Sequence, residues 1–112
     1  MKGTHLGEFE ELILLMVGIL HDQAYGVAIM QAFEEHTGRS VKISAVHAAL
    51  HRLEKKGHLT SWVGGATQER GGRRKRFFEI TSAGKAALIA RRDMRERLWG
   101  LLPDLALQRG SS

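Results

Sequence analysis

Residues 43–57 read ISAVHAALHRLEKKG, and apolar and polar side chains recur in this segment with the spacing of a helix. At 100° per residue, one side of that helix carries the apolar residues Ile43, Val46, Ala49, Leu50 and Leu53. Serine is a favoured N-cap residue and glycine commonly ends a helix, so Ser44 and Gly57 mark the expected ends. The segment therefore predicts a short amphipathic helix that buries one face.

The opposite face of this helix carries the kinds of side chain that a DNA-binding helix needs. Hydrogen-bond donors, with one small residue that allows close approach, are present at Ser44, His47, Ala48, His51, Arg52 and Lys55, and at Lys42 just before them. Apart from Glu54, the segment from Ser44 to Lys56 carries no acidic residue. Any amphipathic helix also has a solvated polar face, so the neighbouring segments have to decide between the two interpretations.

A strongly basic run follows at residues 70–76, RGGRRKR, with five cations in seven residues. It lies next to two segments rich in β-forming residues, 59–63 and 76–80, which predicts a hairpin with a long basic tip. Clustered cations repel one another unless a polyanion is bound. We therefore predict phosphate contacts by Gly72, Arg73, Arg74 and Lys75. A solvated loop on a basic protein is the alternative.

The remaining segments complete a known order of elements. Apolar periodicity predicts two earlier helices at residues 6–20 and 25–37. After the hairpin, Thr81 and Ser82 suit the cap of a last helix, which Pro103 ends. The fold class is therefore mainly α with a small β-hairpin, in the order of a winged helix-turn-helix with an added C-terminal helix. We expect a winged helix-turn-helix domain at residues 6–81, a C-terminal helix at 82–102 and a frayed tail at 103–112.

Length and composition limit the possible functions. A chain of 112 residues with 43% hydrophobic residues suits one domain with its own core. The longest apolar run, from Leu12 to Leu20, is about half as long as the ~20 residues that span a bilayer, and the chain does not open with a secretory signal pattern. We therefore expect a cytoplasmic protein that does not enter the membrane. The lack of cysteine excludes disulfides and thiolate chemistry.

Positive charge is concentrated in the middle of the chain. The net charge is +5 and the isoelectric point is near 10.1. Residues 42–76 hold nine Lys and Arg against two Asp and Glu, whereas residues 1–41 hold two against six. A charge that served only solubility would be spread more evenly, so this distribution favours a polyanionic partner for the third helix and the hairpin.

Together these segments resemble the PadR family of bacterial transcriptional regulators. The resemblance extends from Leu6 to about Leu101 and rests on the order and spacing of several motifs. They are LGEFE at 6–10, AYGVAI at 24–29, SAVHAALHRLEKKG at 44–57, ERGGRRK at 69–75 and TSAG at 81–84. The single C-terminal helix is similar to that of the family's shorter branch.

The resemblance implies a homodimer that binds double-stranded DNA. In it the C-terminal helices pair, and the two third helices enter successive major grooves of a pseudo-palindromic operator. It also implies that Tyr25 and the glycine-rich hairpin touch the DNA backbone, although packing in a turn or in the core is the alternative for Tyr25. The dimer interface would then use the apolar stripe of the last helix, namely Ala83, Ala87, Ala90, Met94, Leu98, Trp99 and Leu101.

Two positions depart from the pattern of the family. His47 stands where the family usually has a tyrosine after the valine of the third helix, so we expect a different DNA preference. Some relatives bind flat aromatic compounds in the dimer interface with a tryptophan midway along the last helix. Here Arg95 lies near that position and Trp99 near the helix end. A small-molecule effector therefore stays unassigned, and we interpret Trp99 as interface packing.

Other functions fit parts of the sequence less well. His47 and His51 have the spacing of two metal ligands, but position 48 is alanine and no third ligand is close, so we expect no metal, no cofactor and no enzyme. A winged helix that binds an acidic protein partner is the main alternative. RNA is disfavoured because the helix suits a B-form major groove and no aromatic stacking surface is evident. We predict a sequence-specific DNA-binding regulator that represses by blocking polymerase, and the sequence leaves activation open.

Overall fold

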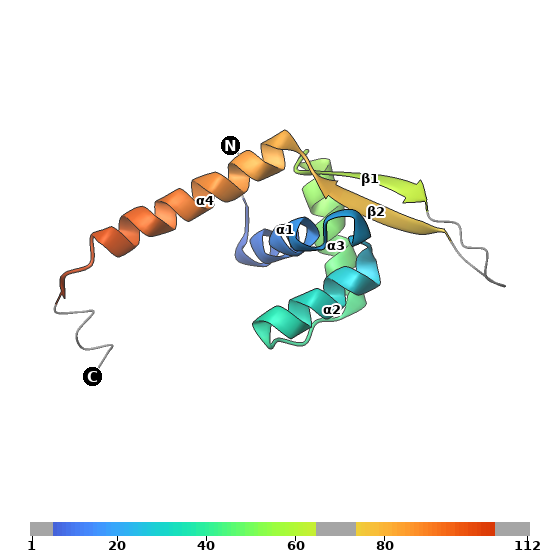
Figure 1. The fold of residues 1–112 in the computed structure, drawn as a ribbon, viewed down its shortest axis with the longest axis horizontal. Coiled ribbons are helices and arrows are strands. Elements are labelled where there is room, and N and C mark those ends of the chain that lie inside the picture. The colour runs from blue at the N-terminus through green and yellow to red at the C-terminus, as the bar shows by residue number, and fades with distance from the viewer. Residues whose placement is uncertain (1–5, 65–73, 105–112) are drawn as a thin grey trace.

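The computed structural model describes residues 6–64 and 74–104 as three packed helices, a two-stranded hairpin and a long C-terminal helix (Figure 1). In chain order the elements are helix α1 (Glu8–Leu20), the 3-10 turn η2 (His21–Gln23), helix α2 (Gly26–Thr37), helix α3 (Ile43–Lys55), strand β1 (Leu59–Gly64), strand β2 (Lys75–Ile80) and helix α4 (Ser82–Gly100). This order confirms the predicted winged helix-turn-helix with an added C-terminal helix. Within these described ranges, no helix is long and apolar enough to cross a membrane.

The three N-terminal helices enclose the hydrophobic core. All three contribute to its largest fully buried side chains, which are Phe33, Ile13, Leu14, Ile29, Leu50, Leu53, Val17 and Val46. The rings of Phe9 and Phe33 meet edge to face, with their centroids 5.4 Å apart. Burying each side chain of this size contributes about 2 kcal/mol to folding, so this core holds α3 firmly against α1 and α2.

The start of α3 differs from the sequence prediction. Ser44 is not the N-cap, because the helix begins at Ile43 and Lys42 is the capping residue. The backbone of Lys42 is extended, and its carbonyl oxygen accepts hydrogen bonds from the N–H groups of Ala45 (3.0 Å) and Val46 (3.2 Å). Ser44 therefore lies inside the first turn, where its hydroxyl does not cap the helix. Ile43 is 36% exposed, so the buried face of α3 begins at Val46 and not at Ile43 as predicted.

The hairpin has the predicted strands to within one residue. β1 and β2 pair antiparallel, with Leu59 opposite Ile80 at the base of the hairpin. The predicted glycine-rich tip falls at residues 65–73, which lie outside the described residues. Gly72 and Arg73, two of the predicted phosphate-contacting residues, are in that segment.

The segment before α2 joins the free edge of β2. The N–H of Phe78 donates to the carbonyl oxygen of Ala24 (2.9 Å), and Tyr25 forms a single antiparallel bridge with Phe77. The hairpin is therefore attached to the start of α2 through this backbone hydrogen bond and bridge, which fix its position relative to the helices.

Helix α4 starts tightly against the base of the hairpin. As predicted, Thr81 is its N-cap: its Oγ1 accepts a hydrogen bond from the N–H of Gly84 (3.0 Å) and donates to the carbonyl oxygen of Gly57 (2.6 Å). A Cβ atom at Gly84 would lie 2.2 Å from the carbonyl oxygen of His58, so only glycine permits this approach.

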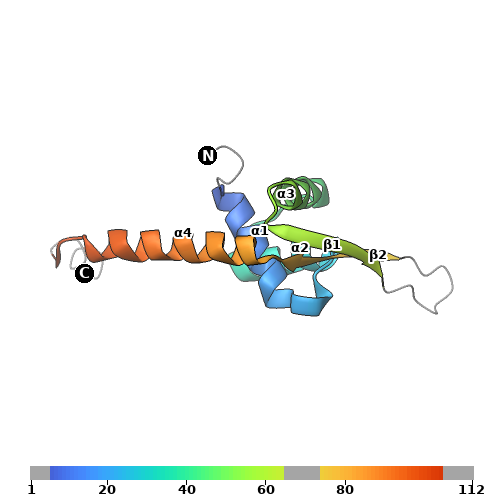
Figure 2. The ribbon, with the colours of Figure 1, turned by 90° about the horizontal axis from the view of Figure 1, so that it is seen from above.

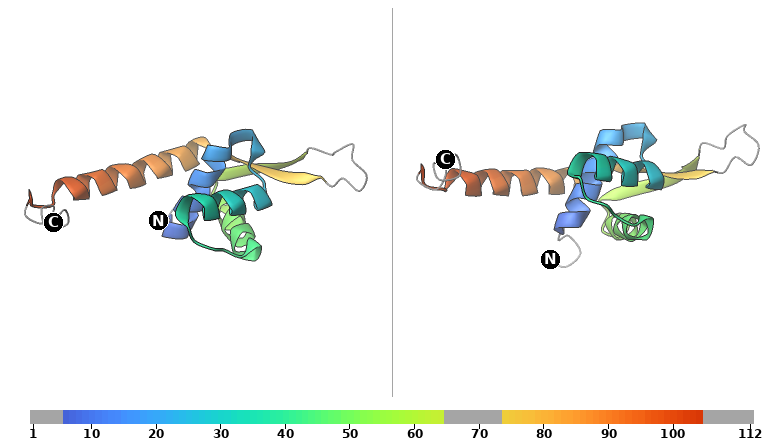
Figure 3. Two further views of the ribbon diagram at one scale, coloured as in Figure 1. Left: turned by 60° about the horizontal axis from the view of Figure 1, so that its bottom comes forward. Right: turned by 90° about the horizontal axis from the view of Figure 1, so that it is seen from below.

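Beyond this junction, α4 and the hairpin extend in opposite directions from the helical unit (Figures 1 and 2). Two further views agree with this arrangement (Figure 3). The molecule measures 61 × 34 × 21 Å, and its radius of gyration is 17.0 Å, compared with about 13 Å for a compact domain of about 100 residues. Among the described residues of α4 only Gly84 is buried, so most of this helix lies outside the core of the chain.

Candidate nucleic-acid interface

The predicted DNA-facing side chains of α3 all lie on the surface. The exposed residues at the start of the helix and along it are Lys42, Ser44, His47, Ala48, His51, Arg52 and Lys55. On the other side of α3, Val46, Ala49, Leu50 and Leu53 are almost completely buried. The core thus turns the polar face of α3 outward, where another molecule can reach it.

Arg52 differs from its neighbours because it is tied to α1. Its Nε donates to Glu10 Oε2 (2.6 Å), and Lys56 Nζ donates to Glu10 Oε1 (2.7 Å). Burial alone raises the pKa of Glu10, but the hydrogen bonds from Lys56 and Arg52 outweigh it and lower the pKa from 4.5 to about 2. Burial, followed by the charge of Lys56, lowers the pKa of the nearby His58. The sequence gives no signal for the Arg52 pair, because its partner lies 42 residues away.

His47 lies where α2 and α3 meet the hairpin. A Cβ atom at Gly26 would come within 2.7 Å of His47 Cε1, so the glycine at the start of α2 allows the imidazole to lie against that helix. His47 also lines two surface depressions, one that includes the start of α2 and one between α3 and β2. Sequence reasoning identified His47 but missed the role of Gly26, because the two residues are distant in the chain.

The larger depression, of about 560 Å³, gathers predicted contact residues from three elements. Its lining consists of Tyr25, Gly26, Val27, His47, Arg74, Lys75, Arg76 and Phe78. Lys75 Nζ lies 4.2 Å from the centroid of the Tyr25 ring, within range of a cation–π interaction. The structure therefore brings together Tyr25, His47, Arg74 and Lys75, which the sequence analysis proposed from separate segments.

The second depression, of about 430 Å³, lies between α3 and the hairpin and reveals a residue that was missing from the prediction. It is lined by His47, Leu50, His51, Glu54, Arg76 and Phe78. Ser61 Oγ donates to Glu54 Oε2 (2.6 Å) and accepts from Arg76 Nη1 (3.0 Å). The one acidic residue of α3 is thereby engaged by the hairpin. Side chains alternate between the two faces of an extended chain, so Arg76 is expected on the same side as Arg74, which directly precedes β2. This alternation is the signal that could have identified Arg76.

The hairpin also carries an aromatic surface that the sequence analysis did not recognise. Trp62 stacks on Phe77 across the two strands with centroids 5.8 Å apart, and Phe77 meets Tyr25 edge to face at 5.6 Å. Trp62 is 42% exposed. This stacked pair contradicts the expectation of no aromatic stacking surface, because the hairpin register aligns two aromatic residues that are 15 positions apart in the sequence.

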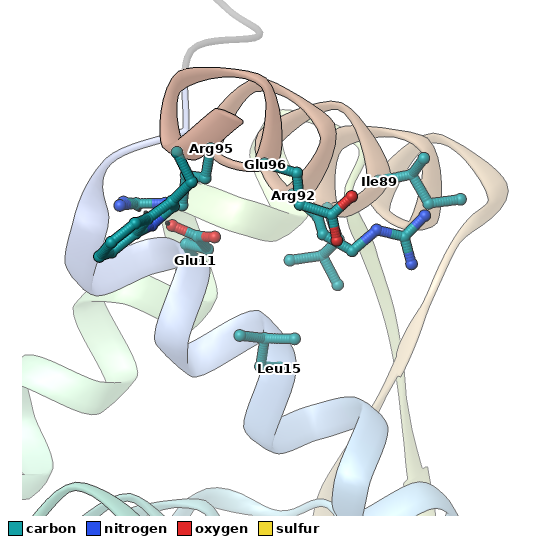
Figure 4. A pocket seen from close by; sticks show the side chains of 8 residues that line it. Glu11, Leu15, Ile89, Arg92, Arg95 and Glu96 are labelled. Atoms are coloured by element: carbon teal, nitrogen blue, oxygen red, sulfur yellow. Dashed lines mark ion pairs between the residues drawn. The ribbon is translucent and has the colours of Figure 1, made fainter. Parts of the chain in front are cut away.

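A third cavity, of about 430 Å³, lies between α1 and α4 (Figure 4). Its lining consists of Glu11, Leu15, Leu88, Ile89, Arg92, Arg95, Glu96 and Trp99. Two of the predicted interface residues, Ala87 and Met94, are half-buried. The other five are exposed, namely Ala83, Ala90, Leu98 (52%), Trp99 (64%) and Leu101 (72%). Helix α4 therefore presents a long apolar surface that the described part of this chain, residues 6–64 and 74–104, does not cover.

A three-helix unit with a hairpin wing and an outward-facing third helix defines the winged helix-turn-helix class of DNA-binding proteins. The family model described as the transcriptional regulator PadR-like family matches residues 15–90, more than half of the chain. The chain belongs to this family, which confirms the resemblance found in the sequence. No curated protein matches the chain significantly.

Solved structures share this fold over most of the chain. A PadR family transcription regulator from Clostridium difficile R20291 is 28% identical, with a TM-score of 0.62 over 80% of this chain and 92% of that one. RosR from H. salinarum is 21% identical, with a TM-score of 0.67 over 95% of this chain and 88% of that one. Bacillus subtilis PadR in complex with operator DNA is 24% identical, with a TM-score of 0.60 over 74% of this chain and 45% of that one. The last two, at this identity, establish the fold alone.

Proposed function

We propose that this protein is a dimeric, sequence-specific transcriptional repressor that binds a pseudo-palindromic operator. Helix α3 enters the major groove, and the basic hairpin contacts the DNA backbone. The observation that carries the proposal is the depression at His47, where this donor of α3 adjoins the cations of the hairpin and the start of α2. Residues able to contact bases and residues able to contact phosphates thus lie side by side, as DNA binding requires.

The roles of the contact residues follow from their positions. Ser44, His47, Ala48 and His51 lie along the exposed face of α3 and are assigned to the base edges, because a major groove about 12 Å wide admits a helix. The phosphate contacts are assigned to the cations and the hydroxyl at the borders of this face, namely Tyr25, Lys42, Lys55, Arg74 and Lys75. Gly72 and Arg73 belong to the same set on sequence grounds. Arg52 serves mainly to hold α3 on α1.

The uncovered surface of α4 supports the homodimer. Leu98, Trp99 and Leu101 are more than half exposed in the single chain, and a second copy of α4 would cover them. A two-fold dimer presents two α3 helices related by the same symmetry, so its preferred DNA site is pseudo-palindromic. A dimer bound at a promoter blocks polymerase sterically, which is the basis for assigning repression.

Fluorescence anisotropy with the DNA upstream of the gene, and with a scrambled duplex, tests the proposal. We expect preferential binding to the upstream duplex and an affinity that falls linearly with salt on a log–log plot. The double variant Arg74→Ala/Lys75→Ala should weaken binding to both duplexes and reduce the salt slope by about 2, because two phosphate contacts are lost. His47→Ala should instead change the ratio of the two affinities.

Lys85→Ala is the matched control, because it removes an exposed cation from the first turns of α4 without touching α3 or the hairpin. Its affinity and salt slope should equal those of the wild type. Equal, salt-insensitive binding of both duplexes by the wild type, or none, contradicts the proposal and favours a winged helix that binds an acidic protein.

A further inference from the structure

Helix α1 carries two adjacent carboxylates that serve two different helices. Glu10 receives the hydrogen bonds from Arg52 and Lys56 of the α3 region. Its neighbour Glu11 faces α4, where Arg91 Nη2 donates to Glu11 Oε1 (3.0 Å) and Arg95 Nη2 lies 3.5 Å from the same oxygen. Consecutive residues of one helix thus connect the proposed recognition helix on one side and the proposed dimerisation helix on the other.

The contacts of Glu11 are shielded and occur at the middle of α4. The Glu11 side chain is only 13% exposed, and the guanidinium of Arg91 also donates through Nη1 to the carbonyl oxygen of Leu6 (2.7 Å). Arg91 therefore fastens α4 both to the side chain of α1 and to the backbone just before it. Figure 4 shows Glu11 of α1 and Arg95 of α4 close together at the cavity between the two helices.

The contacts of Glu11 with Arg91 and Arg95 lie where a small change in the angle of α4 displaces the end of the helix by several ångströms. Beyond Arg91, α4 continues to Gly100 and carries the exposed residues Leu98 and Trp99. A tilt of about 10° at Arg91 displaces the end of the helix, about 15 Å away, by roughly 3 Å. Adjacent base pairs of DNA are about 3.4 Å apart along the helix axis. A displacement of roughly 3 Å therefore corresponds to about one base pair in the distance between two half-sites.

We infer that Glu11, Arg91 and Arg95 form a positioning cluster that sets the separation of the two α3 helices in the dimer, and with it the half-site spacing that the protein selects. The three residues act through the angle of α4 and do not touch DNA. This inference rests on the dimeric DNA-binding function proposed above. A cluster that only stabilised the fold would affect all half-site spacings equally.

The variant Glu11→Gln tests this role, because it removes the charge and keeps the shape of the side chain. Glu8→Gln is the matched control: Glu8 lies on the same helix and pairs with Arg39 at 3.1 Å, but this pair is exposed and connects α1 to the segment before α3. Wild type and both variants would each select sites from a randomised duplex library. Their affinities would then be measured for the best site with one or two base pairs inserted or removed between the half-sites.

We expect the wild type and Glu8→Gln to lose ~10-fold or more in affinity for each base pair of altered spacing, and Glu11→Gln to lose only about threefold. An equal loss of affinity by Glu11→Gln at every spacing, or an unchanged spacing preference, overturns the inference and leaves the proposed function intact. Failure of the wild type to select any duplex overturns the proposed function and the inference with it. Arg95→Gln, which removes a half-exposed partner of Glu11, gives the same test if Glu11→Gln does not fold.

A distance measurement provides a readout that does not involve DNA. The chain has no cysteine, so a Gln31→Cys variant accepts one spin label per protomer at an exposed position of α2. The distance between the two labels in the dimer, measured by double electron–electron resonance, should be narrowly distributed in the wild type and in Glu8→Gln. It should broaden or shift by roughly 3 Å or more in Glu11→Gln. An unchanged distribution in Glu11→Gln overturns the inference.

Discussion

Helices α3 and α4 both pack on α1, and they are held in opposite ways. α3 buries four apolar side chains completely, and Arg52 of α3 and the C-cap residue Lys56 form ion pairs with Glu10 beside that core. α4 buries only Gly84 among its described residues and contacts α1 through half-buried side chains and the Glu11 cluster. The difference indicates that α3 is positioned by the chain itself, whereas the exposed apolar surface of α4 is available to the second copy that we propose.

The largest effect is expected in the buried face of α3. Leu50 is 1% exposed, so Leu50→Ala removes a fully buried side chain and leaves a cavity, which should lower the free energy of unfolding by about 3 kcal/mol. Urea unfolding measures this loss. The control Ile43→Ala, on the same helix but partly exposed, should cost less than about 1 kcal/mol. Equal losses would show that α3 is not held by its buried face.

The Glu10 cluster should make stability depend on pH. The pKa of Glu10 is lowered to about 2 in the folded protein, so its contribution is fully present above about pH 4.5 and is lost as the pH falls toward 2. The expected loss is roughly 2–3 kcal/mol, reduced from the full shift because Arg52 is half exposed. Urea unfolding across this pH range should show the loss in the wild type. Glu10→Gln should start less stable and vary less with pH, and an unchanged pH dependence would contradict the assignment.

The exposed end of α4 should affect association more than folding. Trp99→Ala removes the largest side chain of the uncovered surface and should weaken the dimer by about 2 kcal/mol, or roughly 30-fold in the dissociation constant. Sedimentation equilibrium measures this constant. Trp62→Ala is the matched control, because Trp62 is also a partly exposed tryptophan but lies on the hairpin. If both variants dissociate equally, α4 is not the dimer interface.

The same comparison explains what the sequence could predict. Periodicity identified the buried residues of α3 from Val46 onward, because burial repeats with the helix turn. The partners of Arg52 and Trp62 come from distant segments, Glu10 and Phe77, and only the packed fold brings them close. Charge density correctly marked Arg74 and Lys75 as surface cations. It could not show that Arg52, in the same basic region, is engaged by α1.

The N-terminal ends of α3 and α4 also differ in whether a side-chain hydroxyl caps the helix. The sequence predicts a capping hydroxyl at both, but Ser44 lies inside α3 whereas Thr81 caps α4. Thr81 Oγ1 also donates to the carbonyl oxygen of Gly57, so it links α4 to the turn after α3. Since α4 has few other buried contacts, Thr81→Ala should lower the free energy of unfolding by about 1 kcal/mol. Thr81→Ser keeps the hydroxyl and should retain most of this stability. Ser44→Ala should change the free energy of unfolding by less than about 0.5 kcal/mol. If Ser44→Ala costs as much as Thr81→Ala in urea unfolding, the two helix starts are equivalent and α4 does not depend on its cap more than α3 does.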